Sequence, residues 1–271
     1  MPPSRAGLWL IGIGPGDLGY ITERALKIAK KCDKRYLEGY TAVLPKSQES
    51  VLENIVGPWE RLMRPDIENP DKLLKEASKK TVALLVVGDP MQATTHIDLE
   101  ARCSEENIEF NLIPGMSAIS LAISLSGLQS YRFGRQVTIP FSYGDYLPTS
   151  PLKLIYLNKK NDLHSLVLLD LDPSGMGIDL PKPMNPKYAV KQLKLMVEKL
   201  VRDGFSNLVD DYLIDDWSTI LVSDVGTNEE NIISGSLIEV SNYNSGFIHT
   251  IIFPASMSEN EKEAFERRKK R

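Results

Sequence analysis

The turn Gly88-Asp89-Pro90-Met91 places a carboxylate directly after Thr81–Val87, a run of apolar and β-branched residues that carries no charge. Such a run is typical of a strand buried on both faces of a parallel sheet. Ligands of open α/β sheets bind outside the carboxyl ends of the strands, so this turn could hold a small molecule. The alternative is a plain turn in which Asp89 caps its own backbone, because these residue types dominate turns in general.

Two other turns follow apolar segments in the same way. Gly12-Ile13-Gly14-Pro15-Gly16-Asp17 comes after Leu8–Ile11, and Pro114-Gly115-Met116-Ser117 comes after Phe110–Ile113. The third glycine of the first turn falls two residues after the second, so the Gly-x-Gly-x-x-Gly fingerprint of a dinucleotide site is not met. We expect the three turns to meet at one sheet edge, where glycines let the backbone approach a ligand and backbone N–H groups face it.

These turns do not bring a catalytic set with them. The chain has no Gly-x-x-x-x-Gly-Lys-Ser/Thr phosphate loop, and no Ser/His/Asp or Cys/His arrangement can be nominated. The three histidines, His96, His164 and His249, fall in separate regions, which argues against a metal site. A site that binds without its own acid, base or metal suits group transfer from an activated donor, which carries the chemistry while the protein positions the reactants. Catalytic residues therefore remain unassigned.

The order of the predicted elements indicates an α/β fold with two domains. Strands alternate with helices over residues 1–114, which is typical of a parallel sheet. Residues 115–271 are expected to form a second α/β domain with a mixed sheet. Its predicted strands are 135–140, 165–171, 218–223 and 249–253, and its predicted helix is 190–201.

Several local features accompany these elements. Thr22 is predicted to cap a helix over 23–31, and Thr94 or Thr95 to cap the helix that follows the Gly88-Asp89-Pro90 turn. Glu38 and Tyr40 either line a cleft or belong to a solvated strand end. The tail Glu259–Arg271 is predicted to be a solvated helix end.

Composition limits the classes of protein. The chain has 271 residues, 42% of them hydrophobic and 25% charged, which is typical of a globular protein with sizeable cores. The net charge of −4 argues against an extended nucleic-acid surface. Cys32 and Cys103 are expected to be buried thiols in a reducing compartment. No membrane helix or signal peptide is evident, so a cytoplasmic location is expected.

The three turns together resemble the tetrapyrrole-methylase superfamily of S-adenosylmethionine-dependent methyltransferases. A closer resemblance, to the subfamily of diphthamide biosynthesis, rests on Glu38-Gly39-Tyr40-Thr41, on Ala93-Thr94-Thr95-His96 and on the segment Leu163–Asp170. The resemblance extends over nearly the whole chain. It implies two α/β domains with the cofactor in the cleft between them, and a homodimer.

The resemblance also implies a reaction: methylation of the amino group of 3-amino-3-carboxypropyl-histidine on translation elongation factor 2, giving diphthine. S-adenosylmethionine would be the donor and S-adenosylhomocysteine the product; no metal is implied, and neither a membrane nor direct nucleic-acid contact is expected. The implied cofactor positions, carried over residue by residue, are Pro15, Asp89, Gln92, Ala118, Ile119, Leu169, Val225 and His249.

Two alternatives remain open at this point. The glycine-proline turns alone would equally suit methylation of a corrin or porphyrin precursor, and a cleft without a catalytic set could belong to a non-catalytic S-adenosylmethionine or translation-factor binding module. The chain also departs from the family at four places. Pro15 and Gln92 replace apolar residues, Ala118 replaces a serine, and Asp224 is an acid where the family has a base.

Overall fold

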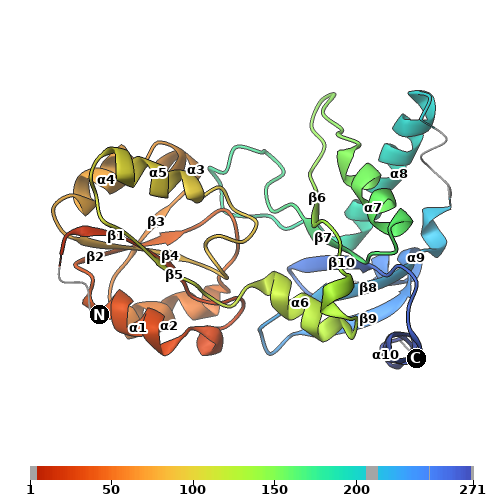
Figure 1. The fold of residues 1–271 in the computed structure, drawn as a ribbon, viewed down its shortest axis with the longest axis horizontal. Coiled ribbons are helices and arrows are strands. Elements are labelled where there is room, and N and C mark those ends of the chain that lie inside the picture. The colour runs from red at the N-terminus through yellow and green to blue at the C-terminus, as the bar shows by residue number, and fades with distance from the viewer. Residues whose placement is uncertain (1–4, 206–212, 244, 270–271) are drawn as a thin grey trace. The chain divides into compact units, whose positions relative to one another are not determined.

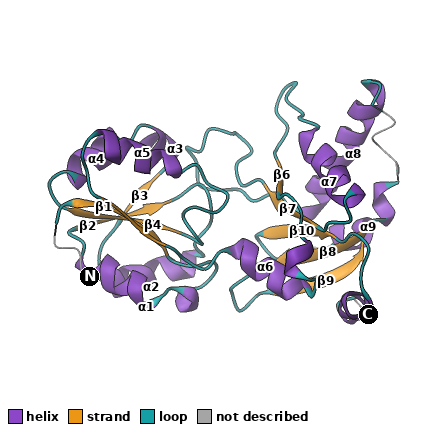
Figure 2. Ribbon diagram, in the orientation of Figure 1, coloured by secondary structure: helices purple, strands orange, loops and turns teal. Residues whose placement is uncertain are grey.

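The computed structural model describes residues 5–205, 213–243 and 245–269. Two compact units make up the fold, and each contains one five-stranded sheet (Figures 1 and 2). Unit 1 comprises Met1–Ala118 and Met176–Pro181, and unit 2 comprises Ile119–Gly175 and Lys182–Arg271. The predicted division at residue 114 stays a prediction, whereas the α/β fold class is confirmed.

The sheet of unit 1 is parallel throughout, with the strand order β3-β2-β4-β1-β5. Its strands are β1 (Gly7–Gly12), β2 (Lys34–Glu38), β3 (Glu60–Leu62), β4 (Thr81–Val86) and β5 (Phe110–Ile113). Every residue of β4 is buried, as its uniformly apolar sequence predicts. Alternate side chains of β4 enter separate cores on the two faces: Ala83 and Leu85 enter one, Val82 and Leu84 the other.

Helices cover both faces of this sheet (Figure 2). The helices α1 (Glu23–Lys31) and α2 (Lys46–Val56) pack on one face, and α3 (Arg64–Glu68), α4 (Asp71–Ala77) and α5 (Ile97–Glu105) pack on the other. The Thr22 hydroxyl accepts a hydrogen bond from the backbone N–H of Ala25 at 3.1 Å, so the predicted cap is confirmed. The prediction of a Thr94 or Thr95 cap is wrong, because α5 begins after His96 and Thr94 donates to the Pro90 carbonyl instead.

The sheet of unit 2 is mixed, as predicted, with the order β6-β7-β10-β8-β9. Only the β6–β7 pair is parallel. The strands are β6 (Val137–Ile139), β7 (Ser165–Leu169), β8 (Ser218–Ser223), β9 (Asn231–Ser236) and β10 (His249–Phe253). The helices α7 (Ser150–Lys160), α8 (Pro186–Arg202) and α9 (Leu237–Ser241) pack on one face, while α6 (Ala118–Ser126) and α10 (Glu259–Arg267) pack on the other.

The C-terminal helix α10 is not the solvated end that its charged sequence predicts. Glu261, Ala264 and Phe265 are buried, and Arg268 donates to the Leu125 carbonyl at 2.9 Å. The error arises because the apolar contacts of this helix are few and its one inward acid looks like a surface residue. The last two residues of the basic run, Lys270 and Arg271, lie outside the described residues.

Both cysteines are free and buried, as predicted. Burial raises the pKa of the Cys32 thiol to about 12 and that of Cys103 to about 11, which keeps both thiols protonated and unreactive. In the described part of the chain, no helix is both long and apolar enough to cross a membrane.

Candidate functional site

The three glycine-containing turns of unit 1 meet at the carboxyl edge of its sheet. Strand register sets Gly12 of β1 beside Val86 of β4, and Ile11 beside Ile113 of β5. Beyond the strands, Gly14 and Gly88 exchange two backbone hydrogen bonds, of 3.2 and 2.9 Å. The convergence expected from the sequence is therefore present, and we call this contact of the three turns the turn junction.

Asp89 ties the junction together through both of its carboxylate oxygens. One oxygen accepts from the backbone N–H of Met91 at 2.9 Å, and this bond caps the residue's own turn. The other accepts from the backbone N–H of Gly115 at 3.1 Å, which links the second turn to the third. The capping interpretation thus describes half of what Asp89 does. The side chain is only half-buried, and an ionised carboxylate can accept further hydrogen bonds from a ligand.

Two glycines of the junction are needed for backbone packing. A Cβ at Gly115 would lie 2.2 Å from the Gly88 carbonyl oxygen, and one at Gly12 would lie 2.5 Å from the Gly115 nitrogen. Gly88 differs, because its φ of +83° requires glycine while its missing Cβ faces open space, with the nearest atom at 4.0 Å. Close approach to a ligand, which the sequence suggested for all these glycines, is therefore open at Gly88.

The other predicted cofactor positions of unit 1 lie on the same three turns. Pro15 is buried and directly follows Gly14. Gln92 is exposed, and its backbone N–H donates to the Asp89 carbonyl at 3.3 Å. Ala118 is half-buried and is the first residue of α6, after the third turn.

Glu38 is not at a solvated strand end, since only 1% of it is exposed. Its carboxylate accepts from the backbone N–H groups of Tyr40 and Thr41, both at 2.9 Å, and from the Thr41 hydroxyl at 2.5 Å. The side chain thus fixes the turn after β2. That Glu38 also lines a cleft stays a prediction.

In unit 2 the strand register brings Leu169 and His249 together at one end of the sheet. Thr250 of β10 pairs with Leu168 of β7, so the antiparallel register places His249 opposite Leu169. His249 also pairs with Ser223 of β8, which in turn pairs with Asn231 of β9. The other two predicted positions, Ile119 and Val225, belong to the core under α6 and α10.

His249 is held in a neutral form. It is 6% exposed, and its Nδ1 lies 2.8 Å from the Ser223 hydroxyl. Burial lowers the pKa of the imidazole below its ordinary value, although the charge of Asp224 opposes this shift. A neutral imidazole can stack on a heterocycle or make one more hydrogen bond with it.

Asp224, the acid that stands where the family has a base, has a structural role. With a φ of +47°, it directs its carboxylate to the backbone N–H groups of Phe247 and Ile248, at distances of 2.8 to 2.9 Å. The acid therefore anchors the segment that leads into His249. Sequence reasoning identified the substitution but not this role, because the two segments are distant in the chain.

The described residues contain no group of three or more His, Cys, Asp or Glu side chains that could hold a metal ion. What the two units present is a backbone-rich junction with one carboxylate and, separately, a neutral imidazole beside an apolar Leu169. This is a set of groups for binding and orienting a ligand, and it contains no evident nucleophile.

Comparison with known proteins identifies the family. Residues 7–241 match the model of tetrapyrrole (corrin/porphyrin) methylases. The chain is 33% identical over 260 residues to diphthine synthase of Methanocaldococcus jannaschii, covering 95% of this chain and 96% of the relative. It is 33% identical over 258 residues to diphthine methyl ester synthase of Saccharomyces cerevisiae, covering 90% and 83%.

The fold agrees with these matches. A crystal structure of diphthine synthase superimposes with a TM-score of 0.82 at 27% identity, covering 97% of this chain and 95% of that one. Sequence and fold thus match over nearly the whole length, and the chain belongs to the tetrapyrrole (corrin/porphyrin) methylases, a family of methyltransferases, and within it to the diphthine synthases.

Proposed function

We propose that this protein transfers methyl groups from S-adenosylmethionine to the amino nitrogen of 3-amino-3-carboxypropyl-histidine on translation elongation factor 2, giving diphthine and S-adenosylhomocysteine. The proposal further includes a homodimer that acts in the cytoplasm. The observation that carries the proposal is the turn junction, with Asp89 bridging two turns beside the open space at Gly88, in a chain related to diphthine synthases over 95% of its length.

The residues at the predicted positions fit such a cofactor. When bound, S-adenosylmethionine supplies a methyl group on a sulfonium sulfur, together with an adenosine and a charged amino-acid tail. Asp89 offers a carboxylate to donors of the ligand, and the backbone around Gly88 permits close approach. Leu169 and the neutral His249 offer an apolar wall and a ring edge suited to a purine. We propose that Pro15, Gln92, Ala118, Ile119 and Val225 complete the binding set.

Alignment supplies most of the catalysis in this proposal. The acceptor nitrogen must present its lone pair to the methyl carbon, so that an N–C bond forms as the C–S bond breaks. The nitrogen must also lose a proton, which solvent can accept. Holding the two reactants in line can contribute several orders of magnitude in rate without a dedicated base.

A methyl-transfer assay tests the function and its rival. The purified protein is incubated with S-adenosylmethionine carrying a labelled methyl group and one of three acceptors: modified elongation factor 2, unmodified elongation factor 2 or a corrin precursor. We expect label only on modified elongation factor 2, over many turnovers. Label on the corrin precursor alone would overturn the proposal in favour of a tetrapyrrole methyltransferase, and stoichiometric binding without turnover would indicate a binding module.

Mass spectrometry of the same product counts the methyl groups. The yeast relative is named a diphthine methyl ester synthase, whereas the archaeal one is named a diphthine synthase. An added methyl that mild alkali removes would place this chain's product with the former.

His249→Gln should separate cofactor binding from base catalysis. Glutamine keeps a polar side chain of similar reach but loses the ring, so the dissociation constant for S-adenosylhomocysteine should rise about fivefold, the loss of about 1 kcal/mol of ring contact. The maximal rate at saturating cofactor should stay near that of the wild type. Calorimetry and initial rates measure the two quantities. Normal binding with a collapsed rate and a lost pH dependence would instead show that His249 is a base.

A further inference from the structure

His249, the predicted cofactor contact of unit 2, is held by Ser223 on the neighbouring strand. The two residues are paired in the antiparallel ladder of β8 and β10, so their side chains project from the same face of the sheet. The Ser223 hydroxyl lies 2.8 Å from His249 Nδ1, and the two residues are only 1% and 6% exposed. This hydrogen bond is therefore shielded from solvent.

The backbone at Gly246 holds the imidazole from another side. A Cβ at this position would lie 2.9 Å from His249 Cε1 and 3.1 Å from Ser223 Cβ, so the glycine packs directly against both residues. The Asp224 carboxylate fixes the segment in between by accepting from the backbone N–H groups of the two residues that precede His249. The ring orientation is thus set by the protein itself, before any ligand binds.

The direction of the hydrogen bond follows from the partners available to each group. A serine hydroxyl can donate and accept, whereas a neutral imidazole has one donor and one acceptor nitrogen. Within residues 5–205, 213–243 and 245–269, His249 Nδ1 is the one hydrogen-bond partner of the Ser223 hydroxyl. If Nδ1 carried the ring proton, the proton of this buried hydroxyl would have no acceptor among the described residues, which is costly. Ser223 therefore donates, and the ring proton is on Nε2.

We propose that Ser223 is a positioning residue of the cofactor site. It holds His249 in the tautomer with the proton on Nε2, because the hydrogen bond at one ring nitrogen decides which nitrogen is protonated. A bound cofactor then meets an N–H group in a fixed place, and not a lone pair. Binding is tighter because neither the tautomer nor the ring orientation has to change. The inference rests on the proposed function for the contact between His249 and the cofactor.

NMR of the imidazole nitrogens identifies the tautomer directly. The chain has three histidines, so the long-range ¹H–¹⁵N spectrum of labelled protein is simple, and the signals that disappear in His249→Gln belong to this residue. His96 is an internal reference for the opposite tautomer, since its Nδ1 lies 2.9 Å from the Pro90 carbonyl oxygen, which can only accept. At about pH 8, where unperturbed histidines are neutral, we expect the His249 proton on Nε2. A proton on Nδ1 would overturn the inference.

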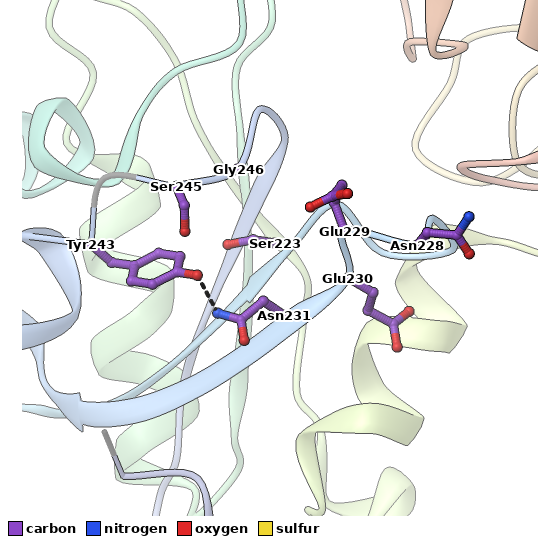
Figure 3. A pocket seen from close by; sticks show the side chains of 8 residues that line it. All are labelled: Ser223, Asn228, Glu229, Glu230, Asn231, Tyr243, Ser245 and Gly246. Carbon is purple, nitrogen blue, oxygen red and sulfur yellow. Dashed lines mark hydrogen bonds between the residues drawn. The ribbon is translucent and has the colours of Figure 1, made fainter. Parts of the chain in front are cut away.

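Ser223→Ala should raise the dissociation constant for S-adenosylhomocysteine about fivefold, as expected for the loss of one hydrogen bond. The His249 signals should move in the same variant, because Nδ1 loses its donor. Ser223→Thr keeps the hydroxyl and should restore both properties, since threonine suits a strand. Ser223 lines a polar cavity of about 240 Å³, which gives the added methyl group room (Figure 3).

Ser241→Ala is the matched control. It also removes a buried hydroxyl from unit 2, but this hydroxyl donates to the Ile238 carbonyl at 2.8 Å and does not contact His249. Calorimetry should therefore give wild-type affinity for S-adenosylhomocysteine, and the His249 signals should stay in place. Circular dichroism establishes that each variant is folded.

A double variant tests whether Ser223 acts through His249. Once glutamine replaces His249, no imidazole remains to be positioned, so adding Ser223→Ala should cause no further loss of affinity. A further fivefold loss in the His249→Gln background, or wild-type affinity in Ser223→Ala alone, would overturn the inference. A wild-type protein that binds no S-adenosylhomocysteine would instead refute the proposed function, and the role of Ser223 in cofactor binding with it. Normal binding together with a His249 proton on Nδ1 would overturn the inference alone.

Discussion

The Gly115→Ala variant should lose affinity for S-adenosylhomocysteine by at least about tenfold while unit 2 keeps its fold. A Cβ at this position would lie 2.2 Å from the Gly88 carbonyl oxygen and 2.9 Å from two backbone atoms of Gly12. No side-chain rotation can relieve contacts between backbone atoms, so the turns must separate. That movement displaces the proposed ligand-facing backbone at Gly88 and stretches the bond from Gly115 to Asp89.

Calorimetry with S-adenosylhomocysteine measures the affinity, and circular dichroism establishes that the variant is folded. Gly204→Ala is the control, because a Cβ there meets no atom within 4 Å, although its φ of +80° imposes backbone strain. Asp89→Asn probes the same junction without a clash, since one accepting oxygen becomes an NH₂ group. Wild-type affinity in both Gly115→Ala and Asp89→Asn would show that the turn junction does not hold the cofactor.

Glu261→Gln should destabilise unit 2 by about 3 kcal/mol at pH 7, because it removes the charge from a buried ionic network. The Glu261 carboxylate lies 3.1 Å from both Arg132 Nη1 and His164 Nε2. It also accepts from the backbone N–H groups of Gln129 and Ser258, at 2.9 and 2.8 Å. The backbone N–H of Ala255 donates to His164 Nδ1, so the proton of the neutral ring is on Nε2 and points to Glu261.

The pH dependence of this effect follows from the pKa of Glu261. Burial alone would raise that pKa, but the hydrogen bonds from Gln129, Ser258 and His164 outweigh burial and lower it from 4.5 to about 2. The unfolded chain therefore binds more protons between these two values. The contribution of Glu261 to stability is complete above about pH 4.5 and is lost as the pH falls towards 2. Burial also lowers the pKa of His164, so acid destabilises the fold further from below about pH 6.5.

Urea unfolding at pH 7, 5 and 3 measures these effects. The difference between the wild type and Glu261→Gln should be largest at pH 7 and should shrink at pH 3, where the Glu261 carboxyl of the unfolded wild-type chain has bound a proton and that of the folded chain has not. Glu263→Gln, on the same helix with a side chain that is 62% exposed, is the control and should change stability by less than about 0.5 kcal/mol. An equal loss for Glu261→Gln at pH 3 and pH 7 would contradict the assignment of its charge as the stabilising feature.

The sequence by itself determined the elements whose patterns are local. The apolar run of β4, the apolar segment of β10 and the Thr22 cap each depend on a few consecutive residues, and the glycine turns at the strand ends could be predicted in the same way. These signals were enough to establish the α/β class, the mixed second sheet and the family. Two strands were not predicted from the sequence. The strand β3 has only three residues, and β9 contains a glycine and two serines, which are typical of turns.

Only the tertiary structure decided which distant groups meet. The Asp89 bond to Gly115 spans 26 residues of chain, the Asp224 anchor of Phe247 spans 23, and the His164 contact with Glu261 spans 97. No periodicity in the sequence indicates such partners, because each of these contacts depends on strand register and on how helices pack over a sheet.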